Sequence, residues 1–342
     1  MRYRLRWRGI LTGCGKTIAL LAIIALLFAL CGCDRLWSAE PDATVRGQEE
    51  NESVIAGNAS EEESLRQDER ARVFLFFSDT QPNPETGDFS GLGKLMEQVA
   101  LRHEAPDLVV FGGDTVNDGG DEAEWREFWM ASGSWLKGLT TAAVAGNHDS
   151  YALLAEQFNY PDRAPATPYG GFFYTLSVGS VYFVMLDSNI MGAGNRSDVE
   201  WLQNALQGEA AGQSDWIIAV MHHPMWPVTD NPKDQQRAAT MREHFMPLLE
   251  AYGVALILCG HQHVYARSRP MLGESESGDG RGIVQIMAAS GDKVTYAQAE
   301  RSYIAAGASA PNYLVLRADS ESLCITAFDS EHAIIDEFTV SK

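Results

Sequence analysis

The sequence predicts an α/β fold in which two mixed β-sheets pack as a sandwich flanked by helices, with a functional site at the carboxyl ends of the strands. Two observations support this prediction. Short apolar runs alternate with amphipathic, helix-like stretches over much of the chain, which is typical of a layered α/β domain. After residue 280 strand-like runs follow one another with turns between them, which indicates a second sheet that closes the sandwich.

The chain opens with a basic stretch of four arginines and a lysine, followed by the uncharged apolar run Thr17–Leu30. This run is shorter than the roughly 20 residues that span a bilayer, so with its basic flank it is typical of a signal peptide. Leu30-Cys31-Gly32-Cys33 then resembles a bacterial lipobox, in which Cys33 is lipidated and becomes the new N-terminus. We therefore expect residues 1–33 to be a lipoprotein signal peptide.

This interpretation makes the protein an exported lipoprotein, held through its lipid on the periplasmic or extracytoplasmic face of a membrane. Two alternatives remain, an uncleaved N-terminal anchor and ordinary signal cleavage. Both of them also place the folded domain outside the cytoplasm.

Residues 34–70 contain eleven acidic and four basic residues and few large apolar ones, a composition that cannot bury a core. We predict a flexible acidic tether there. The remaining residues, 71–342, form a single predicted catalytic domain of about 270 residues, which is long enough for one large core.

The formal net charge is −20, and cleavage before Cys33 would remove five positive charges to give −25. Such an acidic protein is not expected to bind nucleic acid, because phosphate contacts require Lys and Arg. Only Cys259 and Cys324 lie outside the export segment, so the domain is not a disulfide scaffold.

Along the predicted domain, five apolar runs are short enough for strands, and each leads directly into a polar block: Val73–Phe77, Leu108–Phe111, Ala142–Ala145, Trp216–Met221 and Val254–Cys259. Between them lie four stretches whose apolar residues recur at roughly helical spacing: Leu92–Arg102, Glu122–Leu136, Asp198–Leu206 and Met241–Tyr252. Four strand-like runs follow: Ile283–Ala288, Tyr313–Arg317, Leu323–Phe328 and Ile335–Val340.

The polar blocks gather the residue types that bind divalent metals and transfer protons. They are Ser78-Asp79-Thr80-Gln81, Gly112-Gly113-Asp114, Gly146-Asn147-His148-Asp149, His222-His223-Pro224 and Gly260-His261-Gln262-His263. Because sites in open α/β sheets form at the carboxyl ends of strands, we expect these blocks to meet. Seven or eight such groups are enough for two metal ions that share a carboxylate, an arrangement suited to phosphoryl transfer.

In order and spacing, the five blocks resemble the calcineurin-like metallophosphoesterase superfamily across residues 73–267. Gly260–Arg267 and the glycine-bounded Gly282–Gly291 are similar to the purple acid phosphatase branch of that superfamily. The resemblance implies a metallophosphoesterase-type fold and a hydrolase of phosphate esters, monoesters rather than diesters, that uses a metal-bound hydroxide at a binuclear centre.

The resemblance also implies a role for each residue. Asp114 would bridge two divalent or mixed-valence ions of Mn, Fe or Zn. The first ion would also bind Asp79, Gln81 and His263, and the second would bind Asn147, His222 and His261. Asn147 and His148 would orient the substrate phosphate, and His148 would protonate the leaving oxygen. The adjacent His223 would either donate a hydrogen bond behind the metal ligands or line the pocket, and it is a candidate for substrate binding.

Two positions depart from the family pattern. Gln81 stands where the family has His, and an amide oxygen is a weaker ligand than an imidazole for a borderline metal. Gln81 therefore either ligates the first metal directly or holds a water bound to it. Asn117 stands where purple acid phosphatases place a Tyr that binds ferric iron, so we expect no tyrosinate–iron colour.

Two other functions remain open. The ligand set is also compatible with a phosphodiesterase, including one for cyclic nucleotides. A non-catalytic surface lipoprotein that uses the fold for binding is the alternative from another class, and Gln81 is the only residue that favours it.

Overall fold

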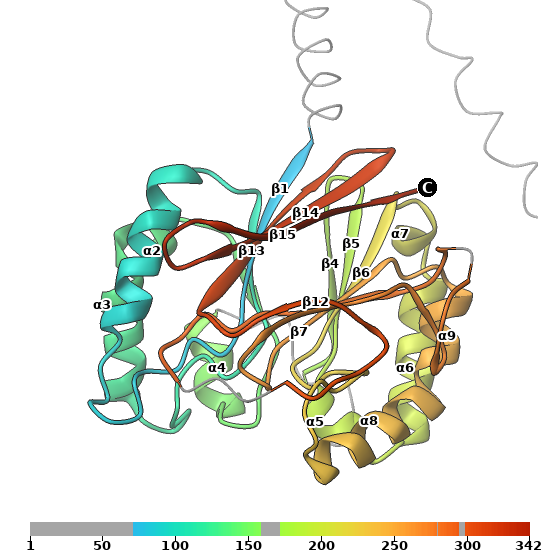
Figure 1. The fold of residues 1–342 in the computed structure, drawn as a ribbon, viewed down its shortest axis with the longest axis horizontal. Coiled ribbons are helices and arrows are strands. Elements are labelled where there is room, and N and C mark those ends of the chain that lie inside the picture. Colours follow the sequence, from blue (N-terminus) through green and yellow to red (C-terminus); the bar gives the residue numbers. More distant parts are fainter. Residues whose placement is uncertain (1–70, 159–171, 279, 294–297) are drawn as a thin grey trace, which may run out of the picture. The chain divides into compact units, whose positions relative to one another are not determined.

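The computed structural model of the protein describes residues 71–158, 172–278, 280–293 and 298–342 (Figure 1). The predicted signal peptide, its lipobox Cys33 and the tether of residues 34–70 lie outside the described residues. Within the described ranges, no helix is both long enough and apolar enough to cross a membrane.

One sheet has six strands in the order β15-β14-β13-β1-β2-β3. Its strands are β1 (Arg72–Phe77), β2 (Leu108–Phe111), β3 (Thr141–Ala143), β13 (Asn312–Ala318), β14 (Ser322–Asp329) and β15 (Ile334–Ser341). β1 pairs in parallel with β2 and antiparallel with β13, so the sheet is mixed. The three parallel strands end at the same edge, where their polar blocks begin.

The other large sheet has seven strands in the order β12-β8-β11-β7-β6-β5-β4. Its strands are β4 (Tyr174–Val178), β5 (Val181–Met185), β6 (Trp216–Val220), β7 (Leu256–Cys259), β8 (Tyr265–Ser268), β11 (Val284–Met287) and β12 (Ile304–Ala308). β5, β6, β7 and β11 run parallel and form its centre. β9 (Met271–Leu272) and β10 (Ser275–Glu276) form a small separate hairpin, which a bridge between Met271 and Ile283 joins to the residue before β11.

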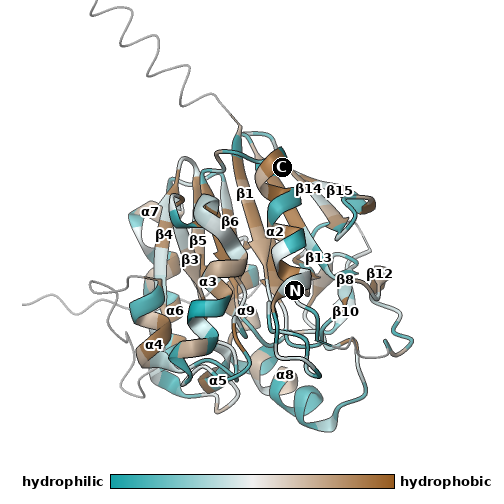
Figure 2. Cartoon of the chain, turned by 90° about the vertical axis from the view of Figure 1, so that its left-hand side faces the viewer, coloured by the Kyte–Doolittle hydropathy of each residue, from teal (hydrophilic) through white to brown (hydrophobic). Residues whose placement is uncertain are grey.

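Helices cover the outer faces of the sheets (Figure 1). They are α2 (Ser90–Arg102), α3 (Glu122–Lys137), α4 (Tyr151–Gln157), α5 (Ser188–Met191), α6 (Arg196–Gln207), α7 (Glu209–Gly212), α8 (Pro232–His244) and α9 (Met246–Ala251). In Figure 1, α2 and α3 lie on one side of the sheets and α6, α8 and α9 on the other. Figure 2 shows hydrophobic strands between helices with hydrophilic surfaces.

The central strands are buried on both faces, which explains why they are continuous apolar runs. In β5, Val181, Phe183 and Met185 pack in the core between the sheets, whereas Tyr182 and Val184 pack in the core beneath α6 and α9. Phe183 also meets Phe74 of the other sheet edge to face, with ring centroids 5.1 Å apart. The predicted α/β sandwich of two mixed sheets is therefore confirmed.

Two details of the sequence-based prediction are wrong. The C-terminal strands do not form a sheet of their own, because β13 pairs with β1 while β11 pairs with β7. The helix predicted over Met241–Tyr252 is two helices, α8 and α9, which meet at Phe245. Pro247 lies in the first turn of α9, where its missing N–H leaves no helical hydrogen bond unmade.

Because Phe183 fills the space between the sheets, we expect Phe183→Ala to lower the free energy of unfolding by about 3–5 kcal/mol. Urea unfolding of the metal-free protein measures this change. Ile334→Ala is the matched control, since Ile334 is 61% exposed and should change stability by no more than about 0.5 kcal/mol. A loss under about 1 kcal/mol for Phe183→Ala would show that the sheets are not held by this contact.

Candidate metal centre

The polar blocks of both sheets meet along the seam between the sheets. Within the six-stranded sheet, the Asp79 N–H donates to the Gly113 carbonyl over 3.0 Å. Within the seven-stranded sheet, the Gly260 N–H donates to the His222 carbonyl, also over 3.0 Å. The backbone N–H of His261 then crosses the seam to Asp79 Oδ2 at 2.8 Å. The site is thus built from strand ends of two sheets rather than one.

Two clusters of metal-ligating atoms form at this seam. Asp79, Asp114 and His263 make one cluster, and Asp114, His222 and His261 make the other. In each cluster the ligand atoms lie within 4.8 Å of one another. Asp114 belongs to both clusters, which is the position that a bridging carboxylate requires.

His222 offers one ring nitrogen to a metal. Its Nδ1 lies 2.9 Å from the Gly112 carbonyl, which can only accept, so Nδ1 donates and Nε2 is the nitrogen that can bind a metal once it has lost its proton. That Nε2 is 3.2 Å from Asp114 Oδ2. The oxygens Asp79 Oδ1 and Gln81 Oε1 are buried with no hydrogen-bond donor. Burying unpaired acceptors together is costly unless a cation binds them, so these residues fit metal ions.

Backbone conformation singles out the same residues. Asp79, Asp114, His261 and His263 have φ values of 49°, 50°, 74° and 50°, in the left-handed region that side chains other than glycine rarely adopt. Among the described non-glycine residues only His332 shares this property. Such conformations persist where the surrounding structure imposes them, and they concentrate at functional sites.

Without a bound metal ion, Asp79 and His222 hold protons more readily than a free carboxyl and a free imidazole do. Burial raises the pKa of Asp79 to about 7. Burial also disfavours a charged His222, but the neighbouring Asp114 outweighs it and raises the pKa of His222 to about 9. For Asp114, the effect of burial is outweighed by His222, which keeps the pKa of the carboxyl below its usual range. Burial and then the charge of Lys293 lower the pKa of His263 to about 3, so His263 is neutral.

Of the two predicted phosphate-binding residues, His148 contacts these clusters through its backbone. The backbone N–H of His148 donates to Asp114 Oδ1 at 2.8 Å. Its ring Nδ1 donates to the Asn117 carbonyl at 2.7 Å, so Nε2 is the ring nitrogen that can contact other groups. Asn147, directly before it, is exposed.

His223 is buried next to the candidate ligand His261. It is only 3% exposed, its ring is tilted by 45° to that of His261 with centroids 4.2 Å apart, and its Nδ1 lies 2.9 Å from Ser188 Oγ. Burial lowers its pKa, so the ring is neutral. This placement supports packing against His261, and the substrate-binding role predicted for His223 stays a prediction.

Asp149 ends the block Gly146-Asn147-His148-Asp149, and no sequence pattern assigned it a role. Its Oδ2 accepts the backbone N–H groups of Asp114 and Gly146, each at 2.8 Å, and its Oδ1 accepts that of Thr115 at 3.2 Å. One carboxylate therefore joins the segments that follow β2 and β3. Its position at the end of the block Gly146-Asn147-His148-Asp149 is the sequence feature that could have indicated this role.

Asp234 was missed altogether. Its Oδ1 lies 3.0 Å from His261 Nε2, and its Oδ2 accepts from Gln262 at 2.7 Å. A carboxylate on one imidazole nitrogen fixes the tautomer and leaves the other nitrogen, Nδ1, for a metal. Asp234 lies in the first turn of α8, whose start is marked by the cap Asn231 and by Pro232, a helix-start signal that sequence analysis overlooked.

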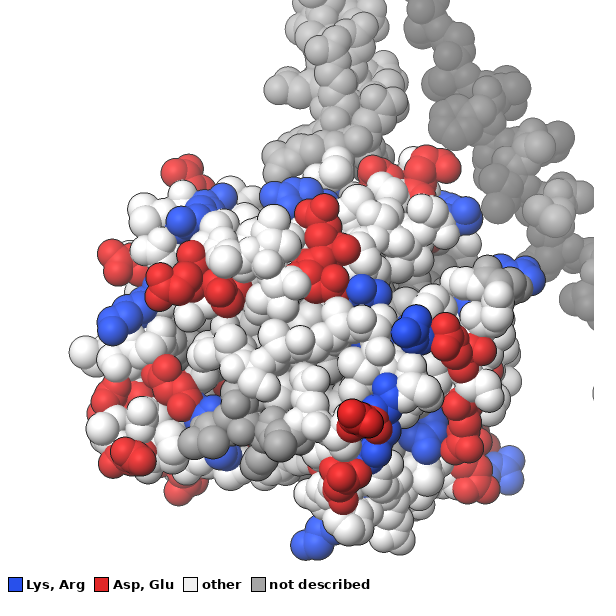
Figure 3. All heavy atoms as spheres, viewed as in Figure 1, with Lys and Arg blue, Asp and Glu red and all other residues white. Residues whose placement is uncertain are grey.

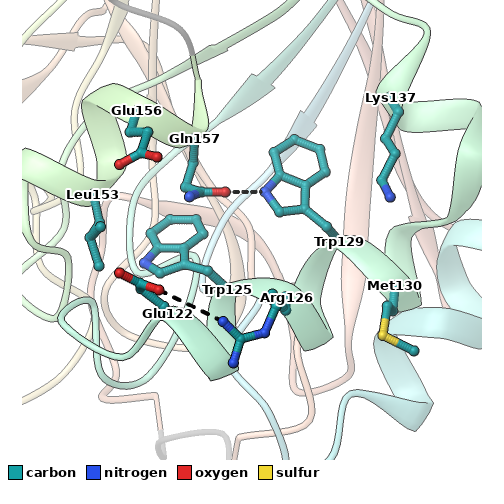
Figure 4. Close-up of a pocket in the computed structure, with 9 residues that line it drawn as sticks. All are labelled: Glu122, Trp125, Arg126, Trp129, Met130, Lys137, Leu153, Glu156 and Gln157. Carbon is teal, nitrogen blue, oxygen red and sulfur yellow. Dashed lines mark hydrogen bonds and ion pairs between the residues drawn. The ribbon is translucent and has the colours of Figure 1, made fainter.

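A separate groove of about 470 Å³ lies between α3 and α4 (Figure 4). Trp125, Trp129 and Leu153 form its apolar part, and Trp129 donates to Gln157 across it. None of the candidate metal ligands lines this groove.

A two-sheet α/β fold with Asp and His clusters at the strand ends defines the class of metal-dependent phosphoesterases. The family model described as calcineurin-like phosphoesterase matches residues 72–265, and the chain belongs to this family. This finding confirms the resemblance read from the five blocks.

Relatives extend the comparison to purple acid phosphatases. The chain is 23% identical over 199 residues to purple acid phosphatase 15 of Arabidopsis thaliana, covering 49% of this chain and 37% of that protein. It is 27% identical over 157 residues to tartrate-resistant acid phosphatase type 5 of Rattus norvegicus, covering 37% of this chain and 44% of that protein. The chain thus spans about two fifths of the length of these relatives.

Among solved structures, the fold is similar to purple acid phosphatase PPD1 from yellow lupin, Lupinus luteus, with a TM-score of 0.64 and 17% identity. That similarity covers 79% of this chain and 54% of the lupin chain, and it concerns the fold.

Metal binding to this site should release protons. Because the metal-free pKa of His222 is about 9, both nitrogens of its ring are protonated at pH 7. The nitrogen that binds a metal must lose its proton. Mn²⁺ affinity should therefore rise as the pH increases from 7 toward 9. Calorimetry at pH 7 in buffers of different ionisation enthalpy measures the proton release, and titration at pH 9.5 is the control in which this release should largely disappear. Heats independent of the buffer at pH 7 would contradict the prediction.

Proposed function

We propose that this protein is an exported phosphoesterase that hydrolyses phosphate monoesters at a binuclear metal site. The observation that carries the proposal is a carboxylate, Asp114, shared by two clusters of ligand atoms, together with the buried oxygens Asp79 Oδ1 and Gln81 Oε1, which have no hydrogen-bond donor. This arrangement is unfavourable for a protein alone and favourable for one that binds two cations.

The first metal ion would be held by Asp79, Gln81, Asp114 and His263. The second would be held by Asp114, Asn147, His222 and His261, with Asp234 fixing the tautomer of His261. Gln81 Oε1 is buried without a donor while its Nε2 points to the Val116 carbonyl at 3.5 Å, so this oxygen would either bind the metal directly or accept from a water bound to it. Mixed oxygen and nitrogen ligands suit Mn, Fe or Zn.

When bound, two such ions supply an activated water near neutral pH and offset charge on the phosphate. The residues of the chain orient the substrate. Asp114 Oδ1 accepts the backbone N–H of His148, which fixes the segment Asn147-His148 beside the ligands. With Nδ1 of His148 donating to the Asn117 carbonyl, Nε2 is the nitrogen that would contact the phosphate. When Nε2 also carries a hydrogen, it would pass that proton to the leaving oxygen and return to the neutral ring.

The site is expected to act outside the cytoplasm, on small phosphate esters rather than nucleic acid. Acidic side chains are spread over the face drawn in Figure 3, with basic ones interspersed. This pattern agrees with the net charge of −20, which disfavours a polyanion. The basic N-terminus, the apolar run and Cys33 support export and a lipid anchor in a membrane.

A phosphodiesterase is the second candidate enzyme, since the same ligands serve both reactions. A non-catalytic binding protein is disfavoured, because the buried acceptors and the His148 contact to Asp114 are those that turnover would need. Metal content well below two ions per chain, with no turnover of any ester, would favour the binding protein.

Hydrolysis of p-nitrophenyl phosphate and of its bis ester, with Mn²⁺, Zn²⁺ or Fe²⁺ added, tests the proposal. We expect faster turnover of the monoester. Asp114→Ala should lower turnover roughly 1,000-fold and abolish metal retention together, because it removes the ligand shared by both clusters. Glu97→Ala, an exposed acid on α2, is the control and should match wild type. Near-normal activity of Asp114→Ala would refute the assignment.

The role of Gln81 can be tested separately. Gln81→His should tighten the first metal by roughly tenfold or more, since an imidazole nitrogen is a stronger ligand for these metals than an amide oxygen. Gln81→Leu, which removes the oxygen at similar size, should lose one of two metal ions on dialysis. Elemental analysis and competition with a chelator measure both effects. Unchanged metal content and affinity in Gln81→Leu would exclude direct ligation.

A further inference from the structure

Lys293 lies at the candidate site, although no sequence pattern pointed to it. Its ammonium Nζ is 3.3 Å from His148 Nε2. Because Nδ1 of His148 donates to the Asn117 carbonyl, Nε2 is the ring nitrogen that a substrate phosphate would meet. An oxygen atom that hydrogen-bonds to His148 Nε2 therefore lies within reach of the Lys293 ammonium as well.

The backbone holds Lys293 in this place. The N–H groups of Ser290, Gly291 and Asp292 donate to the carbonyls of Ser78, Asp79 and Gln81 at 2.8, 2.9 and 3.2 Å. The approach is so close that a Cβ on Gly291 would lie 2.4 Å from the Gln81 carbonyl oxygen. The residue before Lys293 is thus joined to the segment that carries two predicted metal ligands.

A side-chain contact adds a second anchor to this segment. Asp292 Oδ2 accepts the backbone N–H of Gly91, in the first turn of α2, at 2.8 Å. The carboxylate next to Lys293 is therefore engaged with a helix start rather than with the ammonium. Among the described carboxylates, none forms an ion pair with Lys293, so its charge is available to an anion at the site.

We propose that Lys293 contacts the substrate phosphate and makes the site selective for dianionic phosphate monoesters over monoanionic diesters. A monoester carries nearly two negative charges at pH 7, since its second pKa is about 6, whereas a diester carries one. A fixed ammonium adds a charge-assisted hydrogen bond that is stronger for the dianion. This inference rests on the proposed function, and it names the substrate class of that same site.

Three variants of the metal-loaded protein test it. Lys293→Met removes the charge, Lys293→Arg keeps it, and Lys94→Met removes an exposed lysine of α2 as the matched control. Calorimetry with inorganic phosphate measures anion binding without turnover. The kcat/KM ratio for p-nitrophenyl phosphate against its bis ester measures selectivity, and elemental analysis shows whether each variant keeps its metal.

For Lys293→Met we expect phosphate affinity and the monoester-to-diester ratio each to fall about 10-fold to 100-fold, with metal content unchanged. Lys293→Arg should retain most of both, and Lys94→Met should equal wild type. Phosphate affinity of Lys293→Met within twofold of wild type, or equal losses on both esters, would overturn the inference.

The readouts also separate this inference from the proposed function. If wild type hydrolyses neither ester but its phosphate binding depends on Lys293, the proposed function fails and the phosphate contact stands. If wild type hydrolyses the monoester and Lys293→Met does so equally well, the contact fails and the phosphoesterase stands. Wild type that binds no phosphate overturns the inference.

Discussion

Asp79 is the point on which the two sheets of this protein depend. Its backbone N–H donates to Gly113 after β2, its Oδ2 accepts from His261 after β7, and its carbonyl accepts from Gly291 after β11. One residue at the end of β1 thus joins three other strand ends from both sheets. The same residue presents an unpaired Oδ1 to His263 at 3.3 Å, so the joint between the sheets and the candidate metal site are one structure.

Holding the strand ends this close is costly in the absence of a cation. Four candidate ligands adopt left-handed backbone conformations, and the oxygens Asp79 Oδ1 and Gln81 Oε1 are buried without a hydrogen-bond donor. Glycine permits the approach: a Cβ on Gly260 would lie 1.9 Å from Ser78 Oγ and 2.1 Å from Asp79 Oδ2. The core between the sheets provides the stability that holds this geometry, and bound metal ions would add to it by binding the folded state alone.

The two departures from the family pattern affect the site differently. At position 117 the change from Tyr to Asn alters only the side chain, and the carbonyl of Asn117 still orients the His148 ring. At position 81 the change alters a candidate ligand atom, yet Gln81 Oε1 remains buried beside the cluster without a donor. The contact that orients His148 therefore does not depend on the side chain at 117, whereas under the proposed ligand set the residue at 81 would affect the strength of the first metal site directly.

The sequence by itself determined the five strands that lead into polar blocks, those blocks and the candidate ligands, because these are local patterns of apolar runs and residue types. It also identified Gln81 as the candidate metal ligand that departs from the family pattern. It did not determine that β13 joins β1 while β11 joins β7, because strand pairing depends on contacts between residues far apart in the chain. For the same reason, the roles of Asp149, Asp234 and Lys293 came only from the tertiary structure. Each acts through a partner in another segment, over 27 residues for Asp234 and His261 and 145 for Lys293 and His148, and no local pattern encodes such a distance.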